Sequence, residues 1–301
     1  MNQILFIPLF CLIMPFSVYS APKNTDILLI NSNANVEKYL FAQNTFVQKL
    51  TDKNVININL ASYQHSISSL INKLKPKLIY TIGSSAYLSV LKSDPKRPIV
   101  FSSIVNWRRI PLTKHTTGVS AELLPASQLL LFRYFFPDIQ RVGVLYSDTF
   151  NKEWQELAKV SAKEVGLTLV ARRIHSKKSV KKILPSLLKK IDALWLIADP
   201  LVLSSRANIR TLFNMAEQQN KAVFAYDAAF IHMGAVLSIA VDPATTGRQA
   251  AVLSNDVLKN HFPPAVLAPA GSLITLNAKK LNALGLHLNE DALDSVNEVI
   301  E

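Results

Sequence analysis

Short runs of apolar residues recur along the chain from Thr25 onward, and they alternate with longer amphipathic segments. Four runs lie in the first half of the chain and four in the second: residues 26–31, 55–60, 77–83, 97–104, 141–147, 167–173, 191–199 and 221–227. Continuous apolar runs of this length are typical of strands that are covered on both faces. The alternation therefore predicts two α/β units of four parallel strands each, with helical crossovers.

The segments between these runs have the spacing of amphipathic helices. One stripe of the helix expected over residues 151–166 carries Trp154, Leu157, Ala158, Ser161 and Val165. Gly166 follows as the expected stop, because glycine readily adopts the left-handed conformation that ends helices. Further on, Pro200 interrupts a strand, and the side-chain oxygen of Ser204 or Ser205 can cap the helix that follows.

Three segments look like passages between the two units. Residues 118–125 separate the two series of strands, and residues 234–243 and 265–277 flank a helix expected at about 245–259. Three crossings between two similar lobes predict a hinge. A ligand would then bind in the cleft where the carboxyl ends of both sheets face each other.

The expected fold class is α/β, with two Rossmann-like lobes of parallel strands joined by this three-crossing hinge. We expect residues 24–118 and 243–269 to form an N-terminal lobe, and residues 119–242 and 270–301 to form a C-terminal lobe. A chain of 301 residues, 49% hydrophobic and 18% charged, is long enough for two lobes of ordinary size.

Residues 1–20 are predicted to be a cleaved secretory signal peptide. They are mostly apolar, carry no charged side chain and end in short residues where a signal peptidase cuts. Pro8 and Pro15 argue against an uncleaved membrane anchor, and the bulky residues before Cys11 argue against a lipoprotein signal. Because Cys11 is the only cysteine, the mature chain would have no disulfide in its oxidising compartment, which we expect to be the periplasm.

The net charge of +12 is concentrated between residues 152 and 190, where Lys177, Lys178, Lys181 and Lys182 stand at helical spacing. We interpret this stripe as a solvated helix face, with attraction to an anionic envelope surface as the open alternative. Nucleic-acid binding is not expected, because no aromatic interleaving or known binding module accompanies the lysines.

Motifs for cofactors, metals and catalysis do not stand out. The eight glycines form neither a dinucleotide-binding nor a P-loop pattern, and the six histidines have no metal-ligand spacing. Gly83-Ser84-Ser85 lacks the spacing of a nucleophile elbow. We therefore expect no cofactor, no metal and no enzymatic activity, with a two-lobed secreted enzyme as a remaining alternative.

Polar groups follow several of the expected strands. In the first half, Ser84 and Ser85 offer hydroxyls at a helix start, which suits a carboxylate, although a plain serine cap would look the same. Ser102 and Ser103 could hydrogen-bond a ligand or simply be tolerated in a buried strand. Trp107 adds an aromatic ring nearby.

In the second half, Asp199 and Asp227 each place a carboxylate where a buried apolar strand ends, and Tyr146 ends a neighbouring strand. A ligand ammonium would be a natural partner for such an acid. For Asp199 two roles stay open, since it could line the cleft or satisfy the loop amides beneath it. Together the strand ends suit a zwitterion with an apolar side chain, such as an aromatic amino acid.

The blocks ADPLVLSS, KAVFAYDAAFIHMGAVLS and VDPATTGRQAAVLSNDVLK, with IYTIGSSAYLSVL and RVGVLYS before them, resemble the ABC-transporter substrate-binding protein family that includes tryptophan- and tyrosine-binding members. This resemblance implies a type I periplasmic-binding fold and delivery of a small molecule to an ABC permease. Asn106-Trp107 departs from the family's usual Asp-Pro, and Ala240 replaces a glycine often seen in the second crossing.

Carried over to this chain, the family's ligand contacts fall on Ser84, Ser85, Ser102, Ser103, Tyr146, Asp199 and Asp227. We expect Ser84 and Ser85 to hold the ligand carboxylate, Asp227 its ammonium, and Tyr146 or Trp107 its side chain. The expected function is that of a monomeric periplasmic solute-binding protein of an ABC importer. The alternative is a ligand-sensing accessory of a membrane receptor or signalling enzyme, which would use the same fold.

Overall fold

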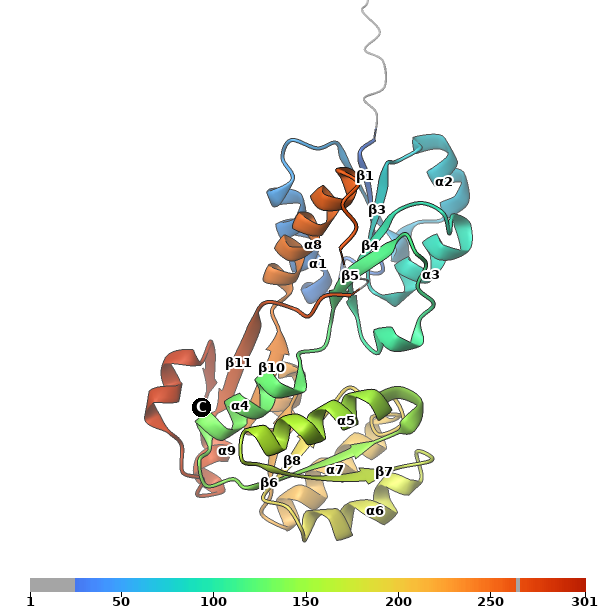
Figure 1. Cartoon of the computed structure of the whole chain (residues 1–301). Coiled ribbons are helices and arrows are strands. Elements are labelled where there is room, and N and C mark those ends of the chain that lie inside the picture. Colours follow the sequence, from blue (N-terminus) through green and yellow to red (C-terminus); the bar gives the residue numbers. More distant parts are fainter. Residues whose placement is uncertain (1–24, 264–265) are drawn as a thin grey trace, which may run out of the picture.

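The chain folds into two α/β lobes joined by extended connections (Figure 1). The structure is a computed structural model that describes residues 25–263 and 266–301. The predicted signal peptide, residues 1–20, lies outside these residues. Among the described helices, none combines the length and the apolar character that a membrane span needs.

The N-terminal lobe contains a sheet of five parallel strands in the order β2-β1-β3-β4-β5. Its strands are β1 (Ile27–Asn31), β2 (Val55–Asn59), β3 (Leu78–Ile82), β4 (Ile99–Ile104) and β5 (Thr116–Ser120). Helices α1 (Glu37–Lys49) and α8 (Pro243–Leu258) pack on one face. Helices α2 (Ile67–Leu74) and α3 (Ser84–Ser93) pack on the other, so the sheet is covered on both sides as its apolar runs predict.

The C-terminal lobe contains a seven-stranded sheet in the order β12-β11-β10-β9-β8-β6-β7, and only the β10–β11 pair is antiparallel within it. Its strands are β6 (Arg141–Tyr146), β7 (Thr168–Arg173), β8 (Ala193–Leu196), β9 (Ala222–Ala225), β10 (Leu237–Val241), β11 (Ser272–Asn277) and β12 (Glu298–Ile300). Helices α4 (Pro125–Phe135) and α5 (Asp148–Glu164) cover one face, and α6 (Ser179–Leu188) and α7 (Arg206–Gln218) cover the other. The short helix α9 (Ala278–Ala283) follows β11.

The eight predicted strands are all present, but the expectation of four strands in each half is wrong. Residues 116–120 form a fifth N-lobe strand, although their polar sequence reads as a connection, because they pair with β4 at the edge of the sheet. Strands β10, β11 and β12 extend the second sheet. The edge strand β12 has too few residues to leave a clear pattern in the sequence.

The helix predicted over residues 151–166 is α5, and its buried stripe differs from the predicted one. Trp154, Ala158 and Ala162 are buried, whereas Leu157 is 49% exposed. The stripe follows a strict four-residue spacing, which turns Leu157 outward. Gly166 adopts a positive φ of 75° and ends the helix, as predicted. The predicted cap of α7 is also confirmed, because Ser205 Oγ accepts a hydrogen bond from the amide of Asn208.

The chain passes between the lobes three times, as predicted: between β5 and α4, between β10 and α8, and between α8 and β11. The third connection lies beside β5, because Val119 of β5 and Leu267 form a parallel bridge. Helix α8 returns to the N-terminal lobe and packs closely on α1. Gly247 allows this approach, since a Cβ there would collide with the carbonyl oxygen of Ala42 and with Thr45 Oγ1.

Candidate functional site

A cavity of about 590 Å3 lies between the two lobes. Its lining from the N-terminal lobe and α8 consists of Val36, Glu37, Lys38, Tyr39, Phe41, Ser103, Val105, Pro243 and Thr246. From the connections and the C-terminal lobe come Ala121, Tyr226, Asp227, Ala228, Ala240, Val241, Leu273 and Glu298. We call this space the outer cavity. Its volume falls in the range of small-molecule sites, and its walls combine aromatic rings with charges of both signs.

Asp227 lies in this outer cavity, where the sequence predicts a cleft residue. It follows β9 and caps the short helix after it by accepting from the amide of Ala229 at 3.0 Å. Its other oxygen pairs with Lys38 Nζ of α1 at 3.2 Å, so an ammonium from the opposite lobe already neutralises it. Both side chains are partly exposed, which weakens the pair by solvent screening.

Asp199 is buried beneath the cleft, and protein donors occupy both of its carboxylate oxygens. Oδ2 accepts from the amide and hydroxyl of Ser147, at 2.7 and 2.8 Å, and from Asn151 Nδ2 at 2.9 Å. Oδ1 accepts from the amides of Leu201 and Val202, at 2.9 and 3.2 Å. These contacts support the second of the two roles that the sequence left open: Asp199 ties the end of β6 to the loop after β8 and orders the floor of the cleft.

The two serines at the end of β4 separate into different environments. Ser102 is fully buried, and its hydroxyl forms a 2.6 Å hydrogen bond with the hydroxyl of Tyr80 inside the N-lobe sheet. In this position Ser102 cannot reach a ligand. Ser103 takes a positive φ of 59° and lines the outer cavity. The left-handed turn of the backbone at Ser103 is what brings one of the two serines to the cleft.

Ser84 and Ser85 begin α3 and are exposed, as a helix-start anion site requires. Gly83 before them has a φ of 84°, which glycine adopts without strain. Ser32 Oγ accepts from the amide of Ala86 at 2.9 Å, so one amide of the first turn is already used by the protein. Neither serine is part of the lining of the outer cavity. The role in carboxylate binding stays a prediction.

Trp107 and Tyr146, the two rings expected to hold a ligand side chain, are half-buried and pack on protein. Trp107 packs against the N-lobe core and carries the guanidinium of Arg108 at 4.5 Å from its ring centroid. Tyr146 packs against the C-lobe core. Neither ring lines the outer cavity, whose aromatic wall comes from Tyr39, Phe41 and Tyr226 instead.

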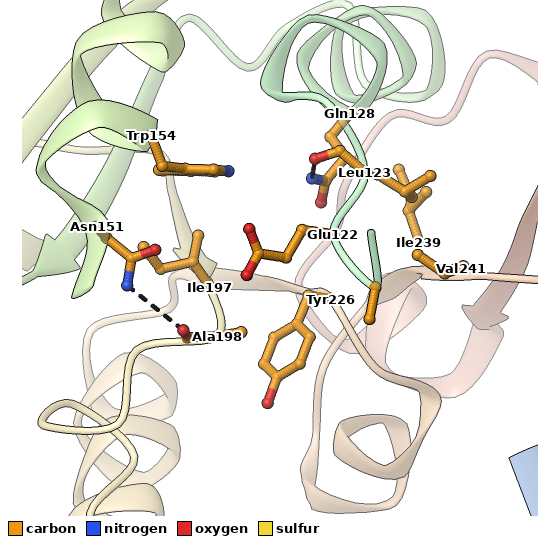
Figure 2. A pocket seen from close by; sticks show the side chains of 11 residues that line it. Glu122, Leu123, Gln128, Asn151, Trp154, Ile197, Ala198, Tyr226, Ile239 and Val241 are labelled. Atoms are coloured by element: carbon orange, nitrogen blue, oxygen red, sulfur yellow. Dashed lines mark hydrogen bonds between the residues drawn. The ribbon is translucent and has the colours of Figure 1, made fainter. Parts of the chain in front are cut away.

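A second, smaller cavity of about 30 Å3 shares three lining residues with the outer one, and we call it the inner pocket (Figure 2). It is lined by Ala121, Glu122, Leu123, Gln128, Asn151, Trp154, Ile197, Ala198, Tyr226, Ile239 and Val241. Ala121, Tyr226 and Val241 line both spaces, which makes them neighbours. The inner pocket lies where the first crossing, the second crossing and the ends of β8 and β9 meet.

Glu122 is the acid of the inner pocket, and the sequence reading missed it. It lies in the first crossing, where Ser120 Oγ accepts from its amide at 3.0 Å and fixes the turn. Burial raises the pKa of the Glu122 carboxyl, although the amide of Asn106 and the guanidinium of Arg108 oppose the rise. The sequence does carry one signal for Glu122. An acidic residue stands there between apolar residues, in a segment that connects the lobes, whereas such connections are ordinarily solvated.

The loop after β4 closes one side of the cleft against the C-terminal lobe. Asn106 Nδ2 donates to the carbonyl oxygen of Ala198 at 3.1 Å, and Arg109 pairs with Glu153 of α5 at 2.6 Å. With the Lys38–Asp227 pair, these contacts hold the lobes together at two places. No group of three histidine, cysteine or acidic side chains suited to a metal occurs among the residues that the structure describes.

The sequence match to a family model decides what kind of protein this is. Residues 47–300 match the family described as ABC transporter substrate binding protein. The chain belongs to this family. The predicted resemblance is thereby confirmed, and the family's members are substrate-binding components, not enzymes.

Individual relatives are distant in sequence. A curated tyrosine-binding protein of Clostridioides difficile strain R20291 is 23% identical over 295 residues, which cover 91% of this chain and 81% of that protein. The alignment with this relative therefore covers nearly the whole of the present chain.

Solved structures show the same fold. A ligand-free, open substrate-binding protein with adhesive properties from Clostridium difficile superposes with a TM-score of 0.73 at 19% identity, covering 92% of this chain and 99% of that one. An ABC domain in complex with L-Trp from Streptococcus pneumoniae gives 0.61 at 19% identity, covering 91% and 100%. A periplasmic ribose ABC transporter protein from Conexibacter woesei gives 0.56 at 11% identity, covering 87% and 94%. The predicted type I periplasmic-binding fold is confirmed.

Proposed function

We propose that this protein is the periplasmic solute-binding component of an ABC importer and that it captures a zwitterionic amino acid, with an aromatic side chain, between its lobes. The observation that carries the proposal is the outer cavity, which both lobes line in a chain that belongs to a substrate-binding family. A ligand in this space touches both lobes, so its binding energy favours the closed arrangement over the open one.

The chemistry of the walls supports a zwitterion. Lys38 and Asp227 place opposite charges on facing lobes, and Glu37 and Glu298 add negative charge at the rim. Tyr39, Phe41 and Tyr226 supply rings against which an aromatic side chain can pack. Relatives named for tyrosine binding and crystallised with L-Trp support the same ligand class. The assignment of the ligand ammonium to Asp227 is a prediction that the experiments below test.

A thermal-shift panel followed by calorimetry tests the ligand class. The purified mature chain is heated with each of the twenty amino acids, with purines and with short peptides. A ligand at 100 times its Kd stabilises the folded chain by roughly 2.7 kcal/mol, which corresponds to a rise in Tm of roughly 5–10 °C. We expect aromatic amino acids to give the largest rise and calorimetry to show one site per chain.

The outcomes separate two parts of the proposal. Stabilisation by a purine or a peptide alone would leave solute capture in place but would refute the zwitterion. For the cellular part, release of the protein by osmotic shock and loss of uptake of the labelled ligand in a deletion strain are expected. Normal uptake in that strain would refute the importer assignment.

A further inference from the structure

We propose, on the basis of the function proposed above, that the ligand ammonium enters the inner pocket and binds between Glu122 and Gln128. The outer cavity then holds the rest of the amino acid. This places the ammonium on the first crossing between the lobes and not at Asp227 on the rim.

Glu122 and Gln128 each bring a hydrogen-bond acceptor on a largely buried side chain to the inner pocket. Glu122 brings a carboxylate whose side chain is only 12% exposed. Gln128 is 4% exposed, and its Oε1 has no hydrogen-bond partner among the residues that the structure describes. The orientation of this amide is set by its other end, because Nε2 donates to the carbonyl oxygen of Leu123 at 3.3 Å. A buried acceptor without a donor is costly, so the pocket favours a ligand group that donates hydrogen bonds.

The shape and the remaining walls suit an ammonium. Figure 2 shows the Glu122 side chain between Trp154 on one side and Tyr226 on the other, with Gln128 above the same space. Aromatic faces attract cations, and they do so more strongly when water is excluded. The volume of about 30 Å3 admits a group about the size of one water molecule, which an ammonium matches. An aromatic side chain is too large for this space.

The inner pocket shares a wall with the outer cavity, and the proposal places the ligand across both. Ala121, Tyr226 and Val241 line both spaces, so a group held at Glu122 lies beside the floor of the outer cavity. An amino acid with its ammonium inside directs its side chain and carboxylate outward. There it meets the cationic Lys38 and the rings of the rim.

The charges around Glu122 leave room for a further cation. The backbone amide of Asn106 donates to Oε1 of Glu122, and Arg108 donates to its Oε2 at 3.3 Å. Two of the roughly four acceptor positions of the Glu122 carboxylate are therefore used. The guanidinium of Arg108 is also held over Trp107. Arg109, the next charge outward, is paired with Glu153. Asp227 also has two donors, the amide of Ala229 and Lys38, but its side chain is 32% exposed against 12% for Glu122, so solvent screens a charge bound there more strongly.

The test is calorimetry on a matched pair of variants, Glu122→Gln and Asp227→Asn, with two ligands. The first ligand is the aromatic amino acid that binds most tightly to the parent, and the second is its desamino analogue, the same acid without the amino group. We expect Glu122→Gln to weaken amino-acid binding by about tenfold to a hundredfold and to leave binding of the analogue unchanged. Asp227→Asn should weaken amino-acid binding less than Glu122→Gln does, and should change the affinities for both ligands by the same factor.

A second variant and a pH series test the proposal without depending on how well Glu122→Gln folds. Gln128→Met removes the unpartnered acceptor with little change in volume and should also weaken only amino-acid binding.

In the parent, affinity for the amino acid should fall as the pH is lowered through the raised pKa of Glu122, because the protonated acid cannot bind an ammonium as strongly. Arg108 and Arg109 are the cations nearest Glu122, the hydrogen bond from Arg109 holds the pKa of Glu153 below its ordinary value, and burial raises the pKa of Tyr226. The Glu122→Gln variant should show no such fall.

The possible results distinguish this proposal from the proposed function. If the parent binds aromatic amino acids but Glu122→Gln binds them equally well and Asp227→Asn does not, the ammonium lies at Asp227 and only this inference fails. If the parent binds no amino acid at all, the proposed ligand class fails and this inference fails with it. Circular dichroism melts of each variant show whether a lost affinity comes from lost folding.

Discussion

Replacement of Asp199 by asparagine separates a structural acid from a ligand-binding one. Asp199 receives hydrogen bonds from five donors of the C-terminal lobe, and three of these are backbone amides that cannot reverse direction. An asparagine of the same shape must place an NH2 group at one of the two oxygen positions. At Oδ1 it would face the amides of both Leu201 and Val202, so we expect it at Oδ2, where only the amide of Ser147 cannot adapt.

The expected cost follows from these contacts. One buried amide without an acceptor costs about 1–3 kcal/mol, and the remaining hydrogen bonds lose the strengthening that a charged acceptor provides. We therefore expect Asp199→Asn to lower the free energy of unfolding by about 2–4 kcal/mol. For a lobe of this size that corresponds to a fall in Tm of roughly 5–15 °C. Asp199→Ala, which leaves every donor unpaired, should cost about 3–5 kcal/mol.

Tryptophan fluorescence is a suitable assay of unfolding, because Trp154 and Trp195 are buried together in the C-lobe core with ring centroids 4.7 Å apart. Calorimetry below the transition then measures ligand affinity of the folded variant, which should stay within about threefold of the parent. Asp192→Asn is the matched control, since that acid also bridges β6 and β8 but is partly exposed and should cost less. An unchanged Tm with a tenfold loss of affinity would refute this reasoning and make Asp199 a ligand contact.

Three further changes test other parts of the structure. Ser102→Ala should lower stability by about 1–2 kcal/mol, because the buried hydroxyl of Tyr80 loses its partner, and should leave ligand affinity unchanged in calorimetry. Gly247→Ala should lower the free energy of unfolding by about 2 kcal/mol or more in urea denaturation, since the new Cβ forces α8 away from Ala42. Glu122→Gln should be more stable than the parent at neutral pH, and the difference should vanish below about pH 4.5.

The sign of the last prediction follows from linkage. The folded-state pKa of Glu122 is raised, so folding favours its protonated form, and that stability is fully present below the unfolded pKa and lost as the pH rises through the folded one. Equal pH profiles of stability for Glu122→Gln and the parent would contradict the burial argument.

The control for Gly247→Ala is replacement of Val252, which is 51% exposed on the same helix, by alanine. This change should cost less than about 0.5 kcal/mol.

Most of the fold could be predicted from local pattern. Apolar runs located eight strands because strands covered on both faces must be apolar throughout, and Ser205 and Gly166 marked helix ends through chemistry that acts within a few residues. Strands β5 and β12 escaped this reasoning, since β12 has a neighbouring strand on one side only, and β5 has β4 on one side and only a single bridge to Leu267 on the other.

The site was predicted less well, because a cleft depends on contacts between residues far apart in the chain. Ser102 and Ser103 are adjacent in sequence, yet one bonds Tyr80 in the core and the other reaches the outer cavity. Asp199 and Asp227 have the same local pattern, but five donors enclose the first while Lys38 of the other lobe meets the second.

The two α/β series and the three segments that connect them can be recognised from the periodicity of the sequence, and the family from blocks of residues such as KAVFAYDAAFIHMGAVLS. Which polar groups face the cleft depends on how distant segments pack together. Glu122 and Gln128 become an acceptor pair because the first crossing is buried against α5 and β9, and burial of this kind is a property of packing that no local stretch of residues encodes.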